Sequence, residues 1–471
     1  MDQSAREQAT ACATPLADGI AALAGTTQFS FHALPISCGT SLHGSRWRER
    51  YESLFGTPYL AGEMTVTGPQ FDSFFFPERA IKEAEALAAA FFGADGTLFV
   101  TTGTTVSNHI ALDSLYAHGQ RVLIDKGCHQ SIHFMLRLLG ADLAYIPASW
   151  SCERSGQQVF CLQRLLQDVL AAQRTGQGYQ LIVLTAHSYD GIVYDIPQVI
   201  GHLLEHGVTT RNFLIDEAWG SANYCHDSLR PYTAMNLGRL CQDYPDLNVV
   251  ATQSAHKSLS CLRQASMIHY RGSPALADSL RLSRFRLHTT SPSYPILASL
   301  DLGRAQMQEE GRELLQRARA QAERFRRTLA EDPAYTALRI DHPQLPASAL
   351  HYVHVDPSKL ALDVEELALG AVEVKELLHN RHGIYVNRVT DHSLLLNFHI
   401  GINSQAVDCL LEALRELCAR PCPWPTQTHS DRFIIPYPPG VPLVVPGEPV
   451  TRHIQRQIRD MQRSGAQVFC A

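Results

Sequence analysis

The feature that most constrains this chain is an alternation of helix-forming segments and short β-branched runs between about residues 78 and 300. The segment 78–92 contains good helix formers, ends at Gly-Ala-Asp-Gly, and is followed by a strand-like run. The predicted strands are 97–100, 121–124, 181–185, 213–215, 247–251 and 266–270. Strands separated by helices predict an α/β fold whose mostly parallel sheet is covered on both faces.

The length of 471 residues exceeds one ordinary hydrophobic core, so about two to three domains are expected. The chain is predicted to divide into an N-terminal arm or cap (1–75), a large domain (76–300), a bridging helix with a smaller α+β domain (301–425), and a C-terminal return segment (426–471). The smaller domain is expected to contain strands at 349–356 and 393–400 around a helix at 363–382. The return segment is predicted to end in a helix.

Charge and cysteine usage exclude several classes of partner. The net charge is −6 and Lys/Arg runs are absent, which argues against nucleic acid and favours small anions or zwitterions as ligands. The N-terminus has no apolar signal region, and no apolar run is long enough to span a bilayer. The twelve cysteines lack Cys-x-x-Cys pairs and zinc-ligand spacing, which favours reduced thiols, no metal and a cytoplasmic protein.

Lys257 is the strongest single indication of chemistry in the chain. It follows the strand-like run 247–251 and is preceded by Ser254 and His256, a setting typical of a lysine that binds an aldehyde cofactor covalently. A free lysine is protonated and inert, whereas the attached lysine activates the aldehyde for exchange with a substrate amine. Ser254 and His256 are candidate phosphate ligands. The alternative is a solvated lysine on a loop.

Asp216 ends the apolar run that begins at residue 212. A buried carboxylate is costly unless it is paired, and the protonated nitrogen of a pyridine ring would supply that pair. The ring could then accept the electron pair released at a substrate α-carbon. Ala218 is small enough to lie beneath such a ring, whereas the alternative for Asp216 is a helix N-cap. Asp216 and Lys257 together predict pyridoxal 5'-phosphate as the cofactor.

Two further motifs follow predicted strands. Gly103, Thr104 and Thr105 lie at a strand-to-helix turn, where free amides, hydroxyls and the helix dipole favour an anion such as the cofactor phosphate. An ordinary Thr-capped helix is the alternative. His129 follows the strand 121–124 and could stack on a flat heteroaromatic ring, but in a chain with 22 histidines a surface or capping histidine gives the same pattern.

These residues, in their order and spacing, closely resemble the ornithine/lysine/arginine decarboxylase family of fold-type-I pyridoxal-phosphate enzymes. The chain resembles a short form without the N-terminal wing domain of the large inducible members. The resemblance covers residue 75 to the C-terminus and rests on segments 92–105, 190–195, 216–220, 254–269, 289–294 and 437–448. It implies an aspartate-aminotransferase-like large domain with a smaller α+β domain.

The resemblance also assigns roles to individual positions. It implies that Lys257 binds the cofactor covalently, Asp216 pairs with the ring nitrogen and His129 stacks on the ring. The implied phosphate ligands are Thr104, Thr105, Ser254 and His256, and Trp219 is an implied pocket wall. Thr290 and Ser291 resemble the segment that reaches the phosphate of a neighbouring subunit, which implies a homodimer with shared active sites, or a larger assembly built from it.

The implied reaction is α-decarboxylation of arginine, lysine or ornithine to an amine and CO2, with Glu448 as the candidate partner of the distal cation. Departures from the family pattern at residues 29–76, at His187 and at Arg263 leave an alternative open. In that alternative the enzyme keeps the cofactor and acts on an arginine- or lysine-like amino acid by elimination, cyclisation, oxidation or aminotransfer, because one fold supports many chemistries.

Overall fold

The computed structural model describes residues 13–26, 30–65, 71–151, 158–341, 343, 345–367, 369–386, 388–420, 428–437, 440–463 and 465–471. The chain forms two compact units. The first spans 1–151, 157–316 and 345–356, and the second spans 152–156, 317–344 and 357–471. The division falls within helix α13 (Tyr294–Glu331). The finer four-segment division given above remains a prediction, and parts of its N-terminal arm lie outside the described residues.

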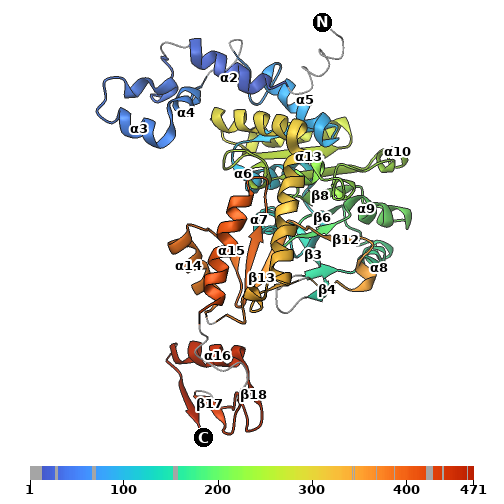
Figure 1. The fold of residues 1–471 in the computed structure, drawn as a ribbon. Helices are drawn as coiled ribbons and strands as arrows, with labels where there is room; N and C mark the ends of the chain where they lie inside the picture. Colours follow the sequence, from blue (N-terminus) through green and yellow to red (C-terminus); the bar gives the residue numbers. More distant parts are fainter. Residues whose placement is uncertain are drawn as a thin grey trace. The chain divides into compact units, whose positions relative to one another are not determined.

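The first unit is built on a seven-stranded sheet with the order β1, β10, β9, β8, β6, β2, β3. Figure 1 labels β8, β6 and β3 of this sheet. The strands are β1 (Gly96–Val100), β2 (Arg121–Asp125), β3 (Asp142–Ile146), β6 (Leu181–Thr185), β8 (Asn212–Asp216), β9 (Asn248–Gln253) and β10 (Ser266–Arg271). Only β10 runs against its neighbours, and the pairs from β9 to β3 are parallel. The predicted mostly parallel α/β sheet is confirmed.

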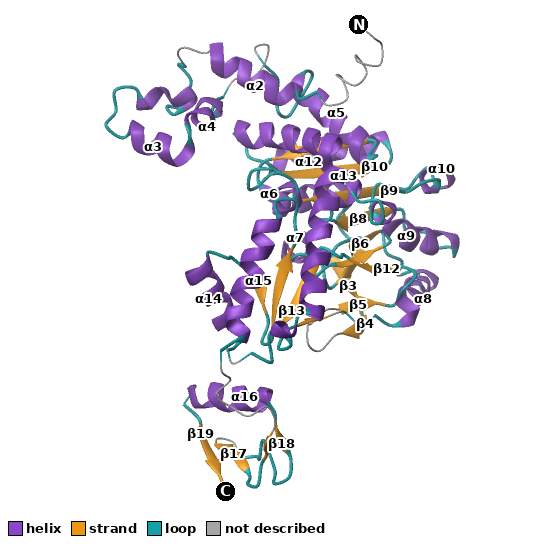
Figure 2. Ribbon diagram, in the orientation of Figure 1, coloured by secondary structure: helices purple, strands orange, loops and turns teal. Residues whose placement is uncertain are grey.

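Helices bury both faces of this sheet. They are α5 (Ala80–Phe92), α6 (Gly103–Leu115), α7 (Gln130–Leu138), α8 (Leu162–Arg174), α9 (Ile196–Glu205) and α12 (Pro274–Leu287). Apolar residues of α6, α7 and α12 pack on strand residues such as Leu214 and Val250, and Figure 2 shows α8 and α9 on the other side of the strands. The residues that alternate with these, such as Phe213 and Ala251, are also fully buried. Burial on both faces explains why the strands are continuous apolar runs.

The direction of the strands gathers the polar motifs at one edge. Strands β1, β2, β6, β8 and β9 run in the same direction, so their carboxyl ends share one edge of the sheet. Strand β8 ends on Asp216, β9 leads through Ser254 into the short helix α11 (Ala255–Ser258), and β1 leads into α6. Ligand sites of open α/β sheets lie at such an edge.

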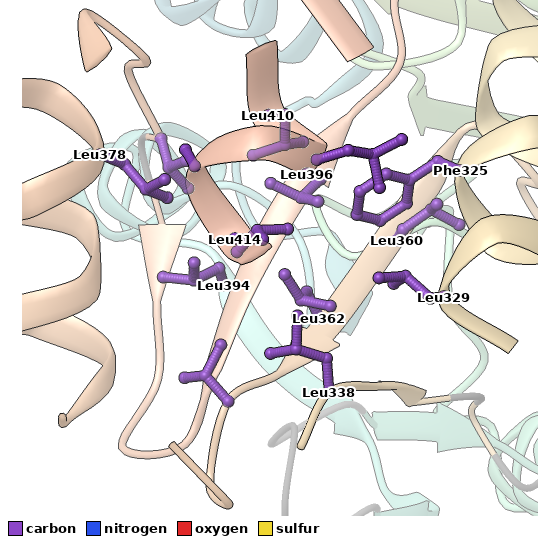
Figure 3. Close-up of a cluster of buried hydrophobic side chains, with 14 of the residues drawn as sticks. Phe325, Leu329, Leu338, Leu360, Leu362, Leu378, Leu394, Leu396, Leu410 and Leu414 are labelled. Atoms are coloured by element: carbon purple, nitrogen blue, oxygen red, sulfur yellow. The ribbon is translucent and has the colours of Figure 1, made fainter. Parts of the chain in front are cut away.

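The second unit has a four-stranded antiparallel sheet with the order β11, β13, β15, β14. Its strands are β11 (Arg339–Asp341), β13 (Lys359–Asp363), β14 (Arg388–Val389) and β15 (Ser393–Asn397), and its larger helices are α14 (Ala371–His382) and α15 (Ser404–Cys418). Figure 3 shows side chains of β13, β15, α14, α15 and α13 meeting in a cluster rich in leucine. The predicted smaller α+β part is therefore present.

Three local expectations were wrong. The region 1–75, expected to be irregular, contains helices α2 (Pro15–Thr26), α3 (Arg48–Phe55) and α4 (Thr57–Gly62). The segment 349–356 contributes only β12 (Val353–Val355), which pairs with β7 (Ile192–Tyr194) of the first unit, a pairing too distant in sequence to read locally. The C-terminal segment ends in β19 (Gln467–Cys470), after helix α16 (Arg452–Arg463).

The helix expected at 363–382 begins later, at Ala371. A capping box at Gly370, whose N–H donates to Glu373 Oε2 over 2.9 Å, sets this start. The expected start at residue 363 belongs instead to the end of strand β13, whose alternating apolar side chains enter the leucine cluster. Within the described ranges, no helix is both long and apolar enough to cross a membrane.

Candidate active site

Lys257 lies in the turn α11 between β9 and β10, where its backbone N–H donates to Ser254 O over 2.9 Å. Its Nζ is 4.3 Å from the centroid of the Trp219 ring. Burial lowers the pKa of Lys257, while the nearby charge of Asp216 opposes that shift. A lysine whose charged form is disfavoured is closer to the neutral amine that attacks a carbonyl.

Asp216 is buried at the end of β8 and has a defined orientation. Its Oδ2 accepts the backbone N–H of His129 over 3.2 Å, and its Oδ1 accepts the N–H of Ala218 over 3.2 Å. The structure therefore brings the Asp216 carboxylate together with the backbone N–H groups of Ala218 and His129. Asp216 is not the N-cap of a helix.

His129 is the N-cap of α7, where its Nδ1 accepts the N–H of Ser131 over 3.3 Å. This is the capping role that the sequence analysis kept as the alternative. Capping occupies only Nδ1, and the backbone of the same residue binds Asp216. The cap orients the ring through Ser131 while the backbone of His129 meets Asp216, so the capping role and the stacking prediction are compatible.

A cluster of hydroxyl groups lies at the start of α6. Thr104 Oγ1 is 2.5 Å from Ser254 Oγ and 2.9 Å from Ser266 Oγ, which places residues of α6, β9 and β10 in one group. Gly103 has φ +80, which favours glycine, and its N–H donates to Gln264 O over 2.9 Å.

The N-cap position of α6, Thr102, makes no side-chain cap, so the amides that follow Gly103 in the first turn are not capped by a side chain and can meet an anion. Free amides, a helix N-terminus and three converging hydroxyls are the donor set that a phosphate monoester requires. The residues present therefore fit the phosphate of the predicted cofactor.

The other predicted residues lie as follows. Thr105 is exposed in the first turn of α6, and His256 Nδ1 lies 2.9 Å from Ala265 O. Thr290 and Ser291 are exposed just after α12. Glu448 lies in the second unit, where its exposed carboxylate accepts the N–H of Val445 over 3.0 Å.

Sequence reasoning missed the residues that support this site. Thr252 Oγ1 donates to Asn108 Oδ1 over 2.6 Å, and Asn108 Nδ2 donates to Ser131 Oγ over 3.0 Å. Ser131 Oγ is in turn 2.9 Å from His129 Nδ1, so a chain of hydrogen bonds joins β9, α6 and α7. The sequence signal that could have identified these supporting residues was a polar residue at a position expected to be buried in a strand or helix.

A second buried network surrounds Glu217, the neighbour of Asp216. Its carboxylate accepts the Tyr224 hydroxyl over 3.0 Å, Gln253 Nε2 over 2.8 Å and the N–H of Ala234 over 3.0 Å. Burial raises the pKa of Glu217 to about 7, although these hydrogen bonds oppose the shift. In the part of the chain that the structure describes, no group of three or more His, Cys, Asp or Glu residues is placed to hold a metal ion.

Comparison with known families gives a match to the model described as "Orn/Lys/Arg decarboxylase, major domain" over residues 14–406. The chain belongs to this family. One relative, lysine decarboxylase LdcA of Pseudomonas aeruginosa, is 32% identical to this chain over 319 residues. The match covers 64% of this chain and 41% of that protein. An arginine decarboxylase of Halalkalibacterium halodurans is 26% identical, over 97% of this chain and 94% of that protein.

Solved structures show the same fold. Lysine decarboxylase A from Pseudomonas aeruginosa matches with a TM-score of 0.75 at 23% identity, over 98% of this chain and 78% of that one. An alanine–glyoxylate aminotransferase from Nostoc matches with a TM-score of 0.52 at 17% identity, over 72% of this chain and 86% of that one. The Orn/Lys/Arg decarboxylase fold of this chain is thus the aspartate-aminotransferase-like, fold-type-I arrangement.

Proposed function

We propose that this protein is a pyridoxal-phosphate-dependent decarboxylase that converts a basic amino acid into an amine and CO2. The observation that carries the proposal is the convergence of Lys257, Asp216 and the Thr104–Ser254–Ser266 hydroxyl cluster at one edge of the sheet. Relatives over nearly the whole chain are named arginine decarboxylase, which supports a basic substrate.

The site geometry supports the following proposed cofactor contacts. Lys257 would bind the aldehyde, Asp216 would pair with the ring nitrogen, and Ala218 and His129 would flank the ring. The phosphate would meet an anion-binding group made of Gly103, Thr104, Thr105, Ser254 and His256. When bound, pyridoxal phosphate supplies an electron sink for the pair left on the substrate α-carbon as CO2 departs.

The protein's own residues prepare this chemistry by burial and orientation. Asp216 is held by two backbone N–H groups, so its carboxylate can keep a proton at the ring nitrogen without reorganising. The Trp219 ring covers one side of Lys257 and excludes water from it. Burial lowers the pKa of Lys257, which favours the neutral amine that attacks a carbonyl.

An exposed apolar patch supports a homodimer with shared active sites. Phe76, Leu282 and Phe285 are 70%, 49% and 49% exposed, and the Phe76 and Phe285 ring centroids are 5.8 Å apart. The patch directly precedes the exposed Thr290 and Ser291, which we propose contact the phosphate of the partner. A second copy would bury the patch and deliver both hydroxyl side chains together.

Two further assignments belong to the same proposal. The nine described cysteines are all free thiols, which supports a reducing, cytoplasmic environment. We also propose that Glu448 binds the distal cation of the substrate. Its carboxylate is exposed and already accepts one backbone N–H, so it would need to bind the substrate with its remaining lone pairs.

The test is a product analysis with the cofactor-loaded protein. Arginine, lysine and ornithine are supplied separately, and mass spectrometry measures the amine while a second assay measures CO2. At least one of the three should yield equimolar amine and CO2. Lys257→Ala, which lacks the reactive amine, should yield neither product. A product that retains the carboxylate would contradict decarboxylation and support the alternative chemistry.

A further inference from the structure

His187 is a buried imidazole just beyond the carboxyl end of β6, and it forms an isolated bridge with Val193. The turn that follows is tight: Gly191 has φ +92 and its N–H donates to Ser188 O over 3.2 Å. The turn carries Tyr189. His187 therefore forms the base of the loop that presents this aromatic residue.

The imidazole joins three segments that are distant in sequence. Its Nδ1 is 3.2 Å from Nδ2 of Asn223, which belongs to the short helix η3 (Ser221–Cys225) after Trp219. Its Nε2 is 3.3 Å from Oδ2 of Asp356, which follows β12. Because the amide nitrogen of Asn223 is a donor, Nδ1 is the acceptor in that contact, while the contact of Nε2 with Asp356 meets the distance of an ion pair but not the geometry of a hydrogen bond. The backbone N–H of Asp356 also donates to Gly191 O over 2.8 Å, so the same residue holds both ends of the loop.

Two of these segments carry the aromatic side chains beside the reactive lysine. The Tyr189 and Trp219 rings meet edge to face, with centroids 4.9 Å apart and an interplanar angle of 89°. Lys257 Nζ lies 4.3 Å from the Trp219 ring centroid. The distance between the loop and η3, which His187 sets, therefore fixes how the aromatic pair lies against Lys257.

We propose that His187 is a positioning residue that sets the Tyr189–Trp219 wall and thereby the selectivity among basic amino acids of different length. The inference rests on the proposed function, because it assigns the wall to the substrate side of Lys257. Pocket walls discriminate between homologous side chains through the space they leave, and one methylene changes specificity about 10- to 200-fold. Loss of His187 releases the wall while leaving the predicted cofactor contacts in place.

The experiment compares His187→Leu and His187→Gln in the cofactor-loaded enzyme. His187→Leu removes both polar contacts at similar volume, whereas His187→Gln retains an amide that can meet Asn223 or Asp356. The ratio of kcat/KM for lysine to that for arginine should change about tenfold in His187→Leu, mainly through KM. It should return toward the wild-type ratio in His187→Gln.

His354→Leu is the matched control. His354 is a half-buried histidine on β12, two residues before Asp356, and its ring stacks on Tyr232 with centroids 3.8 Å apart. Its removal should alter stability but leave the lysine-to-arginine ratio unchanged. An unchanged ratio in His187→Leu, or an equal change in the control, would overturn the positioning role. If His187→Leu does not fold, Asn223→Leu removes the contact between His187 and Asn223 instead, and it should change the lysine-to-arginine ratio in the same way.

A binding measurement separates this inference from the proposed reaction. Lysine and arginine are titrated into the loaded wild type and variants, and the visible absorption of the cofactor reports each dissociation constant whether or not CO2 is released. Absence of CO2 with every amino acid would refute decarboxylation alone. A ratio of dissociation constants that His187→Leu leaves unchanged would refute the positioning role alone.

Discussion

The strand ends of the first unit and the centre of the second unit are both buried, but they are built from opposite chemistry. The strand ends hold Asp216, Glu217, Thr104 and Ser254 in paired hydrogen bonds. The second unit fills its centre with leucine and phenylalanine side chains (Figure 3). Burying polar groups costs free energy unless each has a hydrogen-bond partner. The residue types at the strand ends are therefore limited by the need for these partners and by the reaction, in addition to the need for a stable fold.

The comparison predicts that substitutions at the strand ends lower activity, whereas substitutions in the centre of the second unit lower stability. Asp216 should give the largest effect. Asp216→Ala should lower kcat/KM by about 10³-fold, because a preorganised charge at the reacting ring is lost. Steady-state kinetics with the amino acid identified in the product analysis measures this effect. A variant with wild-type kcat/KM would show that the buried carboxylate is merely structural.

The leucine cluster should respond in stability alone. Leu394→Ala removes a fully buried side chain of β15, which should cost about 2 to 5 kcal/mol of unfolding free energy. Denaturant unfolding measures the loss, and kinetics below the transition should show an unchanged KM. Leu350→Ala, at a residue 57% exposed, is the control that should change neither quantity. A large KM change in Leu394→Ala would remove the distinction between the regions.

The hydroxyl cluster tests whether buried polar groups at the strand ends bind the cofactor. Ser254→Ala should raise the cofactor dissociation constant about 10- to 100-fold, because a hydrogen bond to a charged phosphate contributes about 1.5 to 3 kcal/mol. Equilibrium dialysis of the cofactor measures it. Ser114→Ala lies on the same helix as Thr104 and loses only a bond to Ile110 O, so it should bind the cofactor as tightly as the wild type. Equal affinities in both variants would argue against a phosphate site.

The smallest expected effect is the pH response of Glu217. Its pKa rises from 4.5 to about 7 on burial, so the folded state holds a proton that the unfolded state releases. This favours folding fully below about pH 4.5, and the contribution is lost as pH rises through about 7. Wild type should therefore lose about 1 to 3 kcal/mol relative to Glu217→Gln across this window.

Denaturant midpoints at several pH values measure the difference between the two proteins. Glu49→Gln replaces an exposed carboxyl on α3 and serves as the control, with no comparable pH-dependent difference expected. Parallel pH curves for wild type and Glu217→Gln would mean that the Glu217 network does not hold the proton.

Sequence alone located most of the sheet and the centre of the site because their signals are local. Strands such as β6 are buried at every position and form uninterrupted apolar runs. The edge strand β3 was missed because most of its residues are only partly buried. Lys257 and Asp216 were recognisable from their immediate neighbours.

The supporting residues could not be read in this way. Ser266 meets Thr104 across 162 positions, and Thr252 meets Asn108 across 144. Neither serine nor threonine is distinctive by itself, and only the folded sheet makes them neighbours. The helix α3 was missed because none of its residues is buried, so no apolar face marks it. The pairing of β12 with β7 was missed because the two strands are distant in sequence.

The reversed strand β10 has a consequence for the synthesis of this protein. Lys257 lies in a short connection between two adjacent antiparallel strands, so its turn can form from nearby residues as soon as they leave the ribosome. The turn before α6 is made much earlier, but among the strands that the structure describes β1 pairs with β10 alone. In the nascent chain β1 must therefore stay unpaired until residue 271 emerges, a period in which a chaperone that covers exposed strands is most useful.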